Sequence, residues 1–259
     1  MGRAGNGGLR GTPRRRDPIA MIRTILFFAY FWTTIVVASP ICLLFLVAEW
    51  LGLGRWTRGA LGACVRAWAR SIMWASGAAV TVQGLEHVPA SGRLCFVSNH
   101  QGDMDIVMTL AYLPRTVGFM AKSQAAWMPI LNLWVAVLGS VFLDRGSLEK
   151  GKQSIDRGVR NIERGRALCI YPEGTRSRGP RMGPFRNGGF KLATRAGAMV
   201  VPITIDGAYR IWEATHRIVP SAVRFVVHPA IPTTDMGPDE RRALPDRVRT
   251  IIESALTGL

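Results

Sequence analysis

The chain has 259 residues, of which 48% are hydrophobic, and it carries a formal net charge of +16. This length and composition fit one sizeable catalytic domain with a short appendage, and the lack of a fixed-period repeat excludes a repeat array. The basic excess, mostly arginine, indicates a polyanionic partner: nucleic acid, an anionic membrane surface or a phosphorylated substrate. The four cysteines form no CxxC pair, which argues against a zinc site and fits a reducing, cytoplasmic compartment.

The N-terminal part differs from the rest in composition. Residues 1–18 are rich in Gly, Arg and Pro and are expected to form a disordered basic tail. The uncharged stretch from Ile25 to Ala48 is long for a signal peptide and has no convincing cleavage site. It predicts either a transmembrane helix or, because Pro40 favours a break near its middle, a hairpin of two helices in one leaflet.

Length and charge favour the hairpin. Each half would be about 22 Å long at roughly 1.5 Å per residue, and a hydrocarbon core is about 30 Å thick. Arginines flank both ends of the stretch, so the positive-inside tendency keeps both ends in the cytoplasm.

From Arg58 to Trp74, apolar residues recur at helical spacing among charged ones. This amphipathic helix either lies on the membrane surface, with its arginines facing anionic headgroups, or packs on the domain. In both cases we assign residues 19–77 to a membrane-associated helical segment.

From residue 78 to residue 259, strand and helix signals alternate, which predicts a single catalytic domain of the α/β class. Its sheet is expected to be central, largely parallel and flanked by helices. The predicted strands are Ala79–Val82, Leu94–Ser98, Val117–Ala121, Ser140–Leu143, Ala167–Tyr171, Val200–Ile205 and Val223–Val227. The predicted helices run from after His100 to about Ala111, over Gln124–Leu138, from about Leu148 to Ile162, and from about Val248 to Leu256.

Polar clusters follow three of these strands. They are Asn99-His100, Asp144-Arg145, and Pro172 to Arg176. Reactive groups of parallel sheets gather at the carboxyl ends of strands, so three such clusters together indicate an active site.

The first cluster predicts a general base. A histidine directly after a strand is positioned to accept a proton, and a nearby carboxylate would fix its tautomer and stabilise its charged form. Asp103 and Asp105 are both candidates, and helical geometry does not decide between them. Because the cluster has no nucleophile other than His100, we expect the hydroxyl of the substrate itself to attack.

The other two clusters predict an anion site. Gly174 lets the backbone approach a ligand closely, and Thr175 and Arg176 supply hydrogen-bond donors. Arg145 and Arg176 together would grip a phosphate, with Lys122 among the nearby cations. For the neighbouring Arg178 and Arg181, a solvated basic loop is the simpler interpretation. No GxxxxGK[ST] loop is present, which argues against nucleotide hydrolysis.

In order and spacing these clusters resemble the 1-acylglycerol-3-phosphate acyltransferases, the lysophosphatidic acid acyltransferases of the glycerolipid acyltransferase superfamily. The resemblance covers roughly residues 80–210. It rests on the His-x-x-x-x-Asp motif from His100 to Asp105, on Val141 to Arg145, on Tyr171 to Arg178 and on Val201-Pro202-Ile203, with weaker similarity from Phe185 to Lys191. Asp103 stands where the family often has an aromatic residue, and Asn187 replaces a frequent lysine or glycine, which puts the acceptor preference in doubt.

The resemblance implies roles for the residues of these clusters. His100 would deprotonate the acceptor hydroxyl, and Asp105 rather than Asp103 would orient it. The expected substrate-binding set is Asn99, Lys122, Arg145, Glu173, Gly174, Thr175 and Arg176.

It also implies an activity. The enzyme would transfer a fatty acyl group from acyl-CoA or acyl-carrier protein to the sn-2 hydroxyl of 1-acylglycerol-3-phosphate, giving phosphatidic acid. No metal or other cofactor is expected. The implied partners are the membrane, lysophosphatidic acid and the acyl donor, without nucleic acid, and the implied place is the cytoplasmic face of the cell membrane.

Three other functions stay open. The first is a related O-acyltransferase that acts on glycerol-3-phosphate or another lysolipid. The second is a non-catalytic basic protein that binds membranes or nucleic acid. The third is a thioesterase, against which the lack of a Gly-x-Ser-x-Gly elbow counts.

Overall fold

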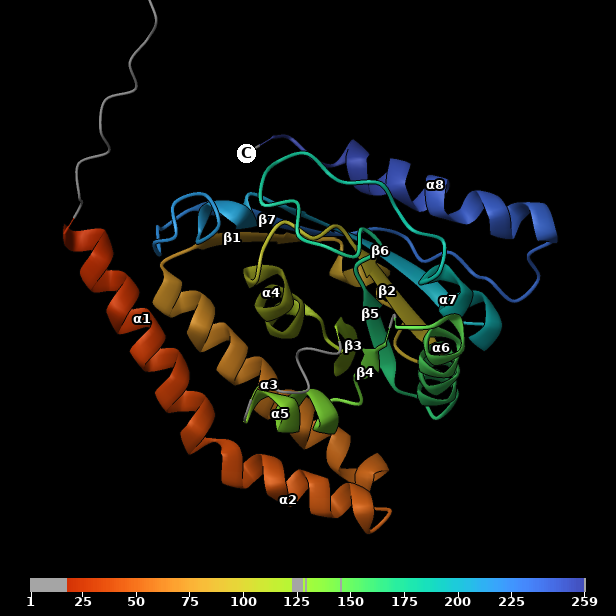
Figure 1. Ribbon diagram of the computed structural model, residues 1–259, viewed down its shortest axis with the longest axis horizontal. Helices are drawn as coiled ribbons and strands as arrows, with labels where there is room; N and C mark the ends of the chain where they lie inside the picture. The colour runs from red at the N-terminus through yellow and green to blue at the C-terminus, as the bar shows by residue number, and fades with distance from the viewer. Residues whose placement is uncertain (1–17, 123–127, 129, 145, 259) are drawn as a thin grey trace, which may run out of the picture.

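The computed structural model describes residues 18–122, 128, 130–144 and 146–258, without the side chains of Lys122 and Leu148 (Figure 1). The predicted disordered tail therefore lies outside the described residues, except for Pro18, which begins a helix.

Three helices form the N-terminal part: α1 (Pro18–Val37), α2 (Ser39–Trp50) and α3 (Gly54–Ser76). The predicted break is present, because Pro40 lies in the first turn of α2, where a missing N–H costs nothing. The expectation that neither half can cross a membrane is wrong for the first half. Helix α1 starts before the uncharged stretch, and its 20 residues are long and apolar enough for a span.

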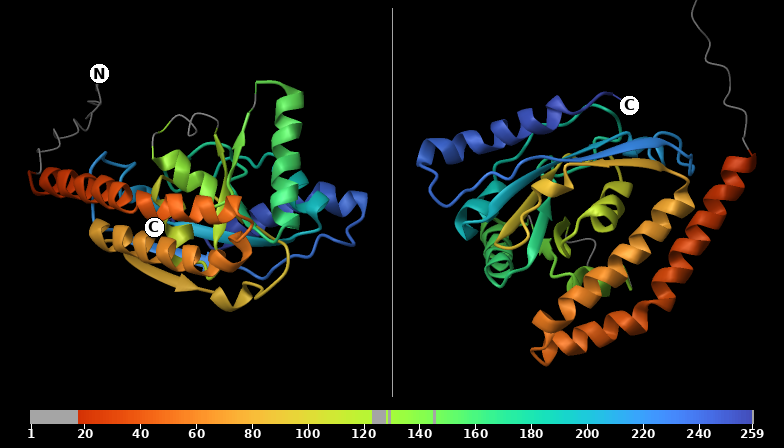
Figure 2. Two further views of the ribbon diagram at one scale, coloured as in Figure 1. Left: turned by 90° about the horizontal axis from the view of Figure 1, so that it is seen from below. Right: turned by 180° about the vertical axis from the view of Figure 1, so that it is seen from behind.

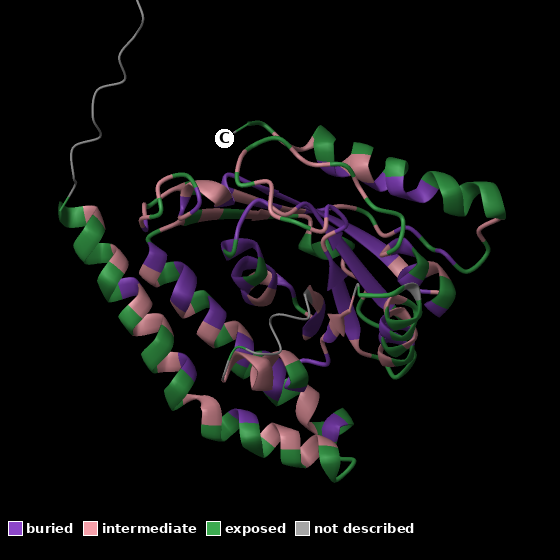
Figure 3. Ribbon diagram, viewed as in Figure 1, coloured by how far each residue is buried: buried purple, intermediate pink, exposed green. Residues whose placement is uncertain are grey.

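Helices α1 and α2 meet in an open bend rather than folding onto each other, and α3 runs back beside them (Figures 1 and 2). Trp68 of α3 donates from Nε1 to Thr34 Oγ1 of α1 at 3.0 Å. The outward faces of α1 and α2 are mostly exposed although their residues are apolar (Figure 3). These two helices therefore present an apolar surface away from the domain.

Helix α3 packs on the domain, which favours the second of its two predicted settings. Leu61, Val65 and Ile72 are buried. Its predicted headgroup-facing arginines bond to the protein itself: Arg58, Arg66 and Arg70 donate to the backbone carbonyls of Arg164, Pro114 and Ala111.

The central sheet has seven strands in the order β1-β7-β6-β2-β5-β3-β4. The β6–β7 pair is antiparallel and the other pairs are parallel, so the predicted largely parallel α/β sheet is confirmed. The strands are β1 (Ala79–Gln83), β2 (Leu94–Ser98), β3 (Val117–Lys122), β4 (Val141–Leu143), β5 (Ala167–Ile170), β6 (Met199–Asp206) and β7 (Ala222–Val227).

Helices cover both faces of the sheet. Along β2, Leu94 and Phe96 belong to the core formed with α3 and α4, whereas Cys95 and Val97 belong to the core formed with α6, α7 and α8. This alternation is expected of a strand buried on both sides. The helices are α4 (Met104–Tyr112), α5 (Leu131–Val137), α6 (Leu148–Glu163), α7 (Phe190–Ala196) and α8 (Pro238–Ser254), with short 3-10 turns η1 (Leu85–His87) and η3 (Ala208–Arg210).

Three helices differ from the sequence prediction. The last predicted helix, from about Val248 to Leu256, is α8, which begins earlier at Pro238 and ends at Ser254. The predicted helix Gln124–Leu138 is helical over Leu131–Val137, and its first residues fall partly outside the described part of the chain. Ile130 has a φ of 67°, which a right-handed helix does not allow, so α5 begins after it. Helix α7 was not predicted, because its seven residues are too few to show a helical period.

Asn99 extends the ladder between β2 and β6 beyond the end of β2. Its Oδ1 accepts from Ile205 N at 2.8 Å and its Nδ2 donates to Ile205 O at 2.8 Å. The residue is 1% exposed. The point at which the chain leaves β2 is thereby fixed to the neighbouring strand.

We expect Asn99→Ala to destabilise the fold, because it leaves the buried N–H and C=O of Ile205 without partners. The expected loss is about 2–4 kcal/mol of the free energy of unfolding, or roughly 5–12 °C in Tm. Thermal unfolding in detergent measures it. The exposed Asn187→Ala is the matched control, with an expected change within about 0.5 kcal/mol. Equal Tm values for the two variants would contradict the role of Asn99.

Candidate active site

The first and third polar clusters meet at one edge of the sheet. Strands β2 and β5 are parallel neighbours, so the residues that follow them leave the sheet side by side. Ser177 N donates to His100 O at 2.8 Å, and Arg178 N donates to Gln101 O at 3.1 Å. The two loops are thus joined through their backbones.

The second cluster lies farther out, because it follows the outermost strand β4. Asp144 pairs with Lys150 at 3.5 Å. Arg145 lies outside the described residues, and Lys122 ends β3 with a side chain that is not described. Their predicted contribution to a phosphate site stays a prediction.

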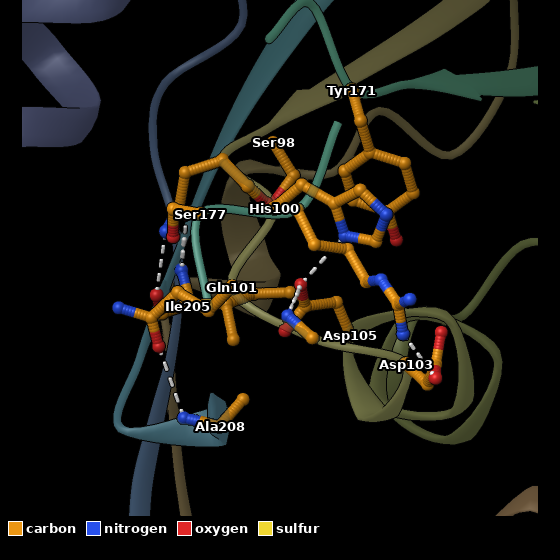
Figure 4. A network of polar contacts seen from close by, with 12 residues as sticks. Ser98, His100, Gln101, Asp103, Asp105, Tyr171, Ser177, Ile205 and Ala208 are labelled. Carbon is orange, nitrogen blue, oxygen red and sulfur yellow. Dashed lines mark hydrogen bonds and ion pairs between the residues drawn. The ribbon is translucent and has the colours of Figure 1, made fainter. Parts of the chain in front are cut away.

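The carboxylate that contacts the candidate base is that of Asp105. His100 Nδ1 lies 2.8 Å from Asp105 Oδ2, which also accepts from Gly102 N at 2.8 Å (Figure 4). Asp105 is fully buried in the first turn of α4. The side chain of Asp103 is 59% exposed and pairs with Arg176 instead. The three-dimensional structure thereby separates two carboxylates that the sequence left as alternatives.

The contact with Asp105 determines the hydrogen bonding of the imidazole. With Asp105 ionised, Nδ1 carries the proton and Nε2 is left as an acceptor. No residue in the described part of the chain hydrogen bonds to Nε2. Burial raises the pKa of Asp105, and the hydrogen bond from His100 is the largest effect opposing that rise.

Tyr171 covers one face of the imidazole. The two rings are stacked, with centroids 4.1 Å apart and an interplanar angle of 18° (Figure 4). The Tyr171 hydroxyl lies 3.3 Å from Thr109 Oγ1 of α4, and the ring of Phe119 is stacked 6.3 Å from that of Tyr171. With Asp105 at its edge and Tyr171 on its face, the imidazole has one orientation.

Glu173 holds the two loops together rather than facing a ligand. Its Oε1 accepts from His100 N at 2.7 Å and its Oε2 accepts from Gly183 N at 2.7 Å. The residue is 4% exposed. Burial raises its pKa, and the two backbone N–H groups oppose the rise. Gly174 follows with a φ of 71°, which suits the tight turn after Glu173.

Arg176 lies in the loop after β5, one residue before Ser177, whose backbone N–H bonds to His100 O. Its Nη1 pairs with Asp103 Oδ2 and lies 3.5 Å from Glu213 Oε1. Glu213 Oε1 also accepts from Asp103 N at 2.7 Å, and the Glu213 side chain is 2% exposed. Burial raises the pKa of Glu213. Two carboxylates thus position a guanidinium that is itself 29% exposed.

The predicted residues differ in their settings. His100, Asp105 and Glu173 are connected by the contacts above. Arg176 contacts Asp103 and Glu213 instead, and Asn99 lies in the core. Gly174 and the exposed Thr175 form the turn after Glu173, where Thr175 has no side-chain bond to a described residue. Arg178 and Arg181 are exposed, which fits a solvated loop.

The sequence analysis missed the contacts of two residues at this site, Glu213 and Tyr171. Glu213 lies in a segment with neither periodicity nor motif, so a lone acid after Ile211 and Trp212 was the only signal. Tyr171 was part of a recognised block, but nothing in the sequence indicated that its ring stacks on His100.

This arrangement can take a proton from a hydroxyl while a guanidinium holds an anion nearby. Within the described residues, no group of three or more His, Cys, Asp or Glu side chains can hold a metal ion.

Comparison with known proteins gives three matches of interest. The chloroplastic 1-acyl-sn-glycerol-3-phosphate acyltransferase BAT2 of Brassica napus is 33% identical over 153 residues, 58% of this chain and 44% of that protein. The human 1-acyl-sn-glycerol-3-phosphate acyltransferase alpha is 29% identical over 180 residues, 69% of this chain and 64% of that protein. The chain thus spans less than two thirds of the length of both relatives.

The third match is a crystal structure, that of the 1-acyl-sn-glycerophosphate (LPA) acyltransferase PlsC from Thermotoga maritima. It superimposes with a TM-score of 0.77 and covers 92% of this chain and 96% of that chain. At 22% sequence identity this likeness establishes the fold. The family model described as Acyltransferase matches residues 79–206, from the first strand to the end of β6. Together with the two relatives, this match shows that the chain belongs to the acyltransferase family that includes the 1-acyl-sn-glycerol-3-phosphate acyltransferases.

Proposed function

We propose that this protein transfers a fatty acyl group from acyl-CoA or acyl-carrier protein to the sn-2 hydroxyl of 1-acylglycerol-3-phosphate, giving phosphatidic acid. The observation that carries the proposal is the imidazole of His100, whose Nδ1 is bonded to the buried Asp105 within the loops that also hold Arg176. The names of the plant and human relatives support the choice of substrate.

The proposed reaction is a direct transfer. Nε2 of His100 accepts the proton of the acceptor hydroxyl as its oxygen attacks the thioester carbonyl. Asp105 stabilises the imidazolium that forms. When the tetrahedral intermediate collapses, the carbon–sulfur bond breaks and the leaving thiolate takes the proton from the imidazolium, which restores the base. No covalent acyl-enzyme is required.

Arg176 is proposed to bind the phosphate of the acceptor, with Arg145, Lys122 and Thr175 as further donors. A guanidinium binds a phosphate by charge-assisted hydrogen bonds. In the free protein Arg176 contacts Asp103 and Glu213, so the phosphate has to compete with these carboxylates for it.

The exposed apolar faces of α1 and α2 support membrane association. The length of α1, which is sufficient to cross a membrane, supports it as well. We propose that residues 19–77 hold the enzyme at the cytoplasmic face of the cell membrane and that residues 78–259 form the catalytic domain. Helix α3 belongs to both parts, because Ala69, Ile72 and Met73 pack in the same core as the sheet.

Replacing the base should abolish most of the activity. We expect His100→Ala to lower kcat for acyl transfer about 10²- to 10⁴-fold, the usual contribution of a general base. Product formation from labelled acyl thioester and lysophosphatidic acid in detergent measures it. The matched control is His87→Ala, which removes an imidazole that bonds Val227 O at the other end of the fold. If His100→Ala formed product as fast as the wild-type protein, the proposed function would be wrong.

Replacing the phosphate-binding cation should affect acceptor binding. We expect Arg176→Gln to raise KM for 1-acylglycerol-3-phosphate roughly ten- to hundredfold, because a charge-assisted hydrogen bond is lost. KM for an uncharged monoacylglycerol should hardly change. Arg181→Gln, in the same loop and exposed, is the control. An unchanged KM for the phosphorylated acceptor in Arg176→Gln would count against this site.

Because the carboxyl of Glu213 is buried, we predict that the stability of the folded protein depends on pH. The folded-state pKa of this carboxyl is raised above the ordinary 4.5, so its ionisation destabilises the folded protein as pH rises from about that value. Glu213→Gln keeps an acceptor for Asp103 N and removes this titration. The Tm of the variant minus that of the wild-type protein should therefore increase from pH 4 to pH 8. A Tm difference that decreases from pH 4 to pH 8 would disprove this effect of Glu213 ionisation on stability.

A further inference from the structure

A pocket of about 320 Å³ lies at the opposite edge of the sheet from His100. His100 follows the carboxyl end of β2, whereas this pocket is lined by residues that precede the parallel strands β3 and β5. Helix α3 and the end of α5 complete it. Its lining residues from these elements include Thr116 before β3, Gly165 before β5, and Leu61 and Leu138 from the helices. The pocket is therefore separate from the candidate active site.

The lining of the pocket is strongly basic. Four arginines line it, namely Arg58, Arg66, Arg115 and Arg166, and no acidic residue does. The nearest carboxylate is that of Glu49, which pairs with Arg166 at 2.5 Å. Each arginine also donates to a backbone carbonyl: Arg58 to Arg164, Arg66 to Pro114, Arg115 to Ala90 and Arg166 to Val137. Arg58, Arg66 and Arg115 each use one nitrogen in these bonds, and their other N–H groups have no partner among the described residues.

Among the described residues, the pairing of Glu49 with Arg166 compensates only part of the positive charge of the pocket. Arg58 Nε is buried without a hydrogen-bond partner there. The pKa of Arg166 is lowered, first by burial, and the charges of Arg58 and Arg164 lower it further against the opposing effect of Glu49. Such repulsion costs folding free energy, and a bound anion would remove the cost.

The size of the pocket limits the ligand to a small group. Ligand pockets usually measure about 300–1,000 Å³, so this one stands at the lower end. Several guanidinium groups around a small volume can form paired hydrogen bonds with the oxygens of a phosphate ester.

The surroundings of the pocket point to a lipid as the source of that phosphate. Glu49 of α2 pairs with Arg166 of the pocket, and Arg58 of α3 lines the pocket. The turn between α2 and α3 lies between these two residues in the chain. The turn and the helix ends beside it carry exposed apolar side chains: Trp50 of α2 is 84%, Leu51 57%, Leu53 48% and Trp56 of α3 72% exposed. It continues the exposed apolar face of α2 (Figure 3). Exposed tryptophans beside an apolar surface are typical of the level of lipid headgroups.

We propose that this pocket binds the phosphate group of an anionic membrane phospholipid, at a site separate from the one that holds the acceptor. This binding would place the α2–α3 turn at headgroup depth and fix the domain on the leaflet. It does not depend on the proposed transfer reaction.

The test uses the full-length protein in neutral detergent micelles doped with phosphatidylglycerol, phosphatidylcholine or neither. A ligand that binds the folded state raises Tm with concentration. Phosphatidylglycerol should raise the Tm of the wild-type protein, and phosphatidylcholine should not. For Arg58→Gln/Arg115→Gln, the apparent Kd for phosphatidylglycerol should rise roughly 25-fold, at about a factor of five for each guanidinium near a membrane surface.

Three further variants control for charge, folding and site. Arg241→Gln/Arg247→Gln removes the same charge from the exposed face of α8 and should bind as the wild-type protein does. Arg115→Gln alone preserves the bond of Arg58 and should weaken binding about five-fold. Arg176→Gln should keep the full effect of phosphatidylglycerol, which separates this pocket from the acceptor site.

Three results would overturn the proposal. Equally weakened phosphatidylglycerol binding in Arg241→Gln/Arg247→Gln would mean that binding depends on the total charge of the protein and not on this pocket. Loss of the phosphatidylglycerol effect in Arg176→Gln would place the lipid in the active site. An equal rise in Tm from inorganic phosphate without lipid would make the ligand a soluble phosphate.

Discussion

The hydrogen bond between His100 Nδ1 and the buried carboxylate of Asp105 is the interaction on which the rest of the site depends. A carboxylate without solvent is costly, so this one needs several donors to stay ionised. It receives them from the imidazole and from Gly102 N, which belong to the same turn between β2 and α4. The turn therefore has to close around Asp105. Because Nδ1 faces Asp105 of α4, Nε2 is the ring nitrogen left for the acceptor hydroxyl in the proposed reaction.

The loops around this bond are held by buried polar side chains that bond to backbone. Asn99 joins the end of β2 to Ile205 of β6, and Glu173 joins the loop after β5 to His100 N. Buried polar groups of this kind are stabilising when every donor and acceptor is satisfied, and they specify one arrangement of the chain. The neighbouring strands β6, β2 and β5 thus act as one frame. In the proposed reaction, Asn99 and Glu173 would support catalysis through that frame rather than by binding a ligand.

Local patterns predicted the strands well, because each central strand is a short apolar run between turn signals, as in Leu94–Ser98. They also predicted that the loops after β2 and β5 meet, since parallel strands share an edge. They could not choose Asp105 over Asp103, because that depends on how the turn closes. They could not find Glu213, which reaches Arg176 from a segment without a pattern. The length of α1 was underestimated because one charged residue, Arg23, lies inside the helix.

The two basic regions of the protein differ in what opposes their charge. Arg176 is paired with Asp103 and Glu213, so an incoming phosphate gains only the difference between its own bonds and those that it replaces. In the proposed function this competition would weaken binding, which suits an acceptor that must leave as product. The pocket at the other edge has four arginines and a single nearby carboxylate, that of Glu49. By the two proposals, a phosphate there would meet less competition and stay bound longer. Arginine would then serve turnover at one edge of the sheet and attachment at the other.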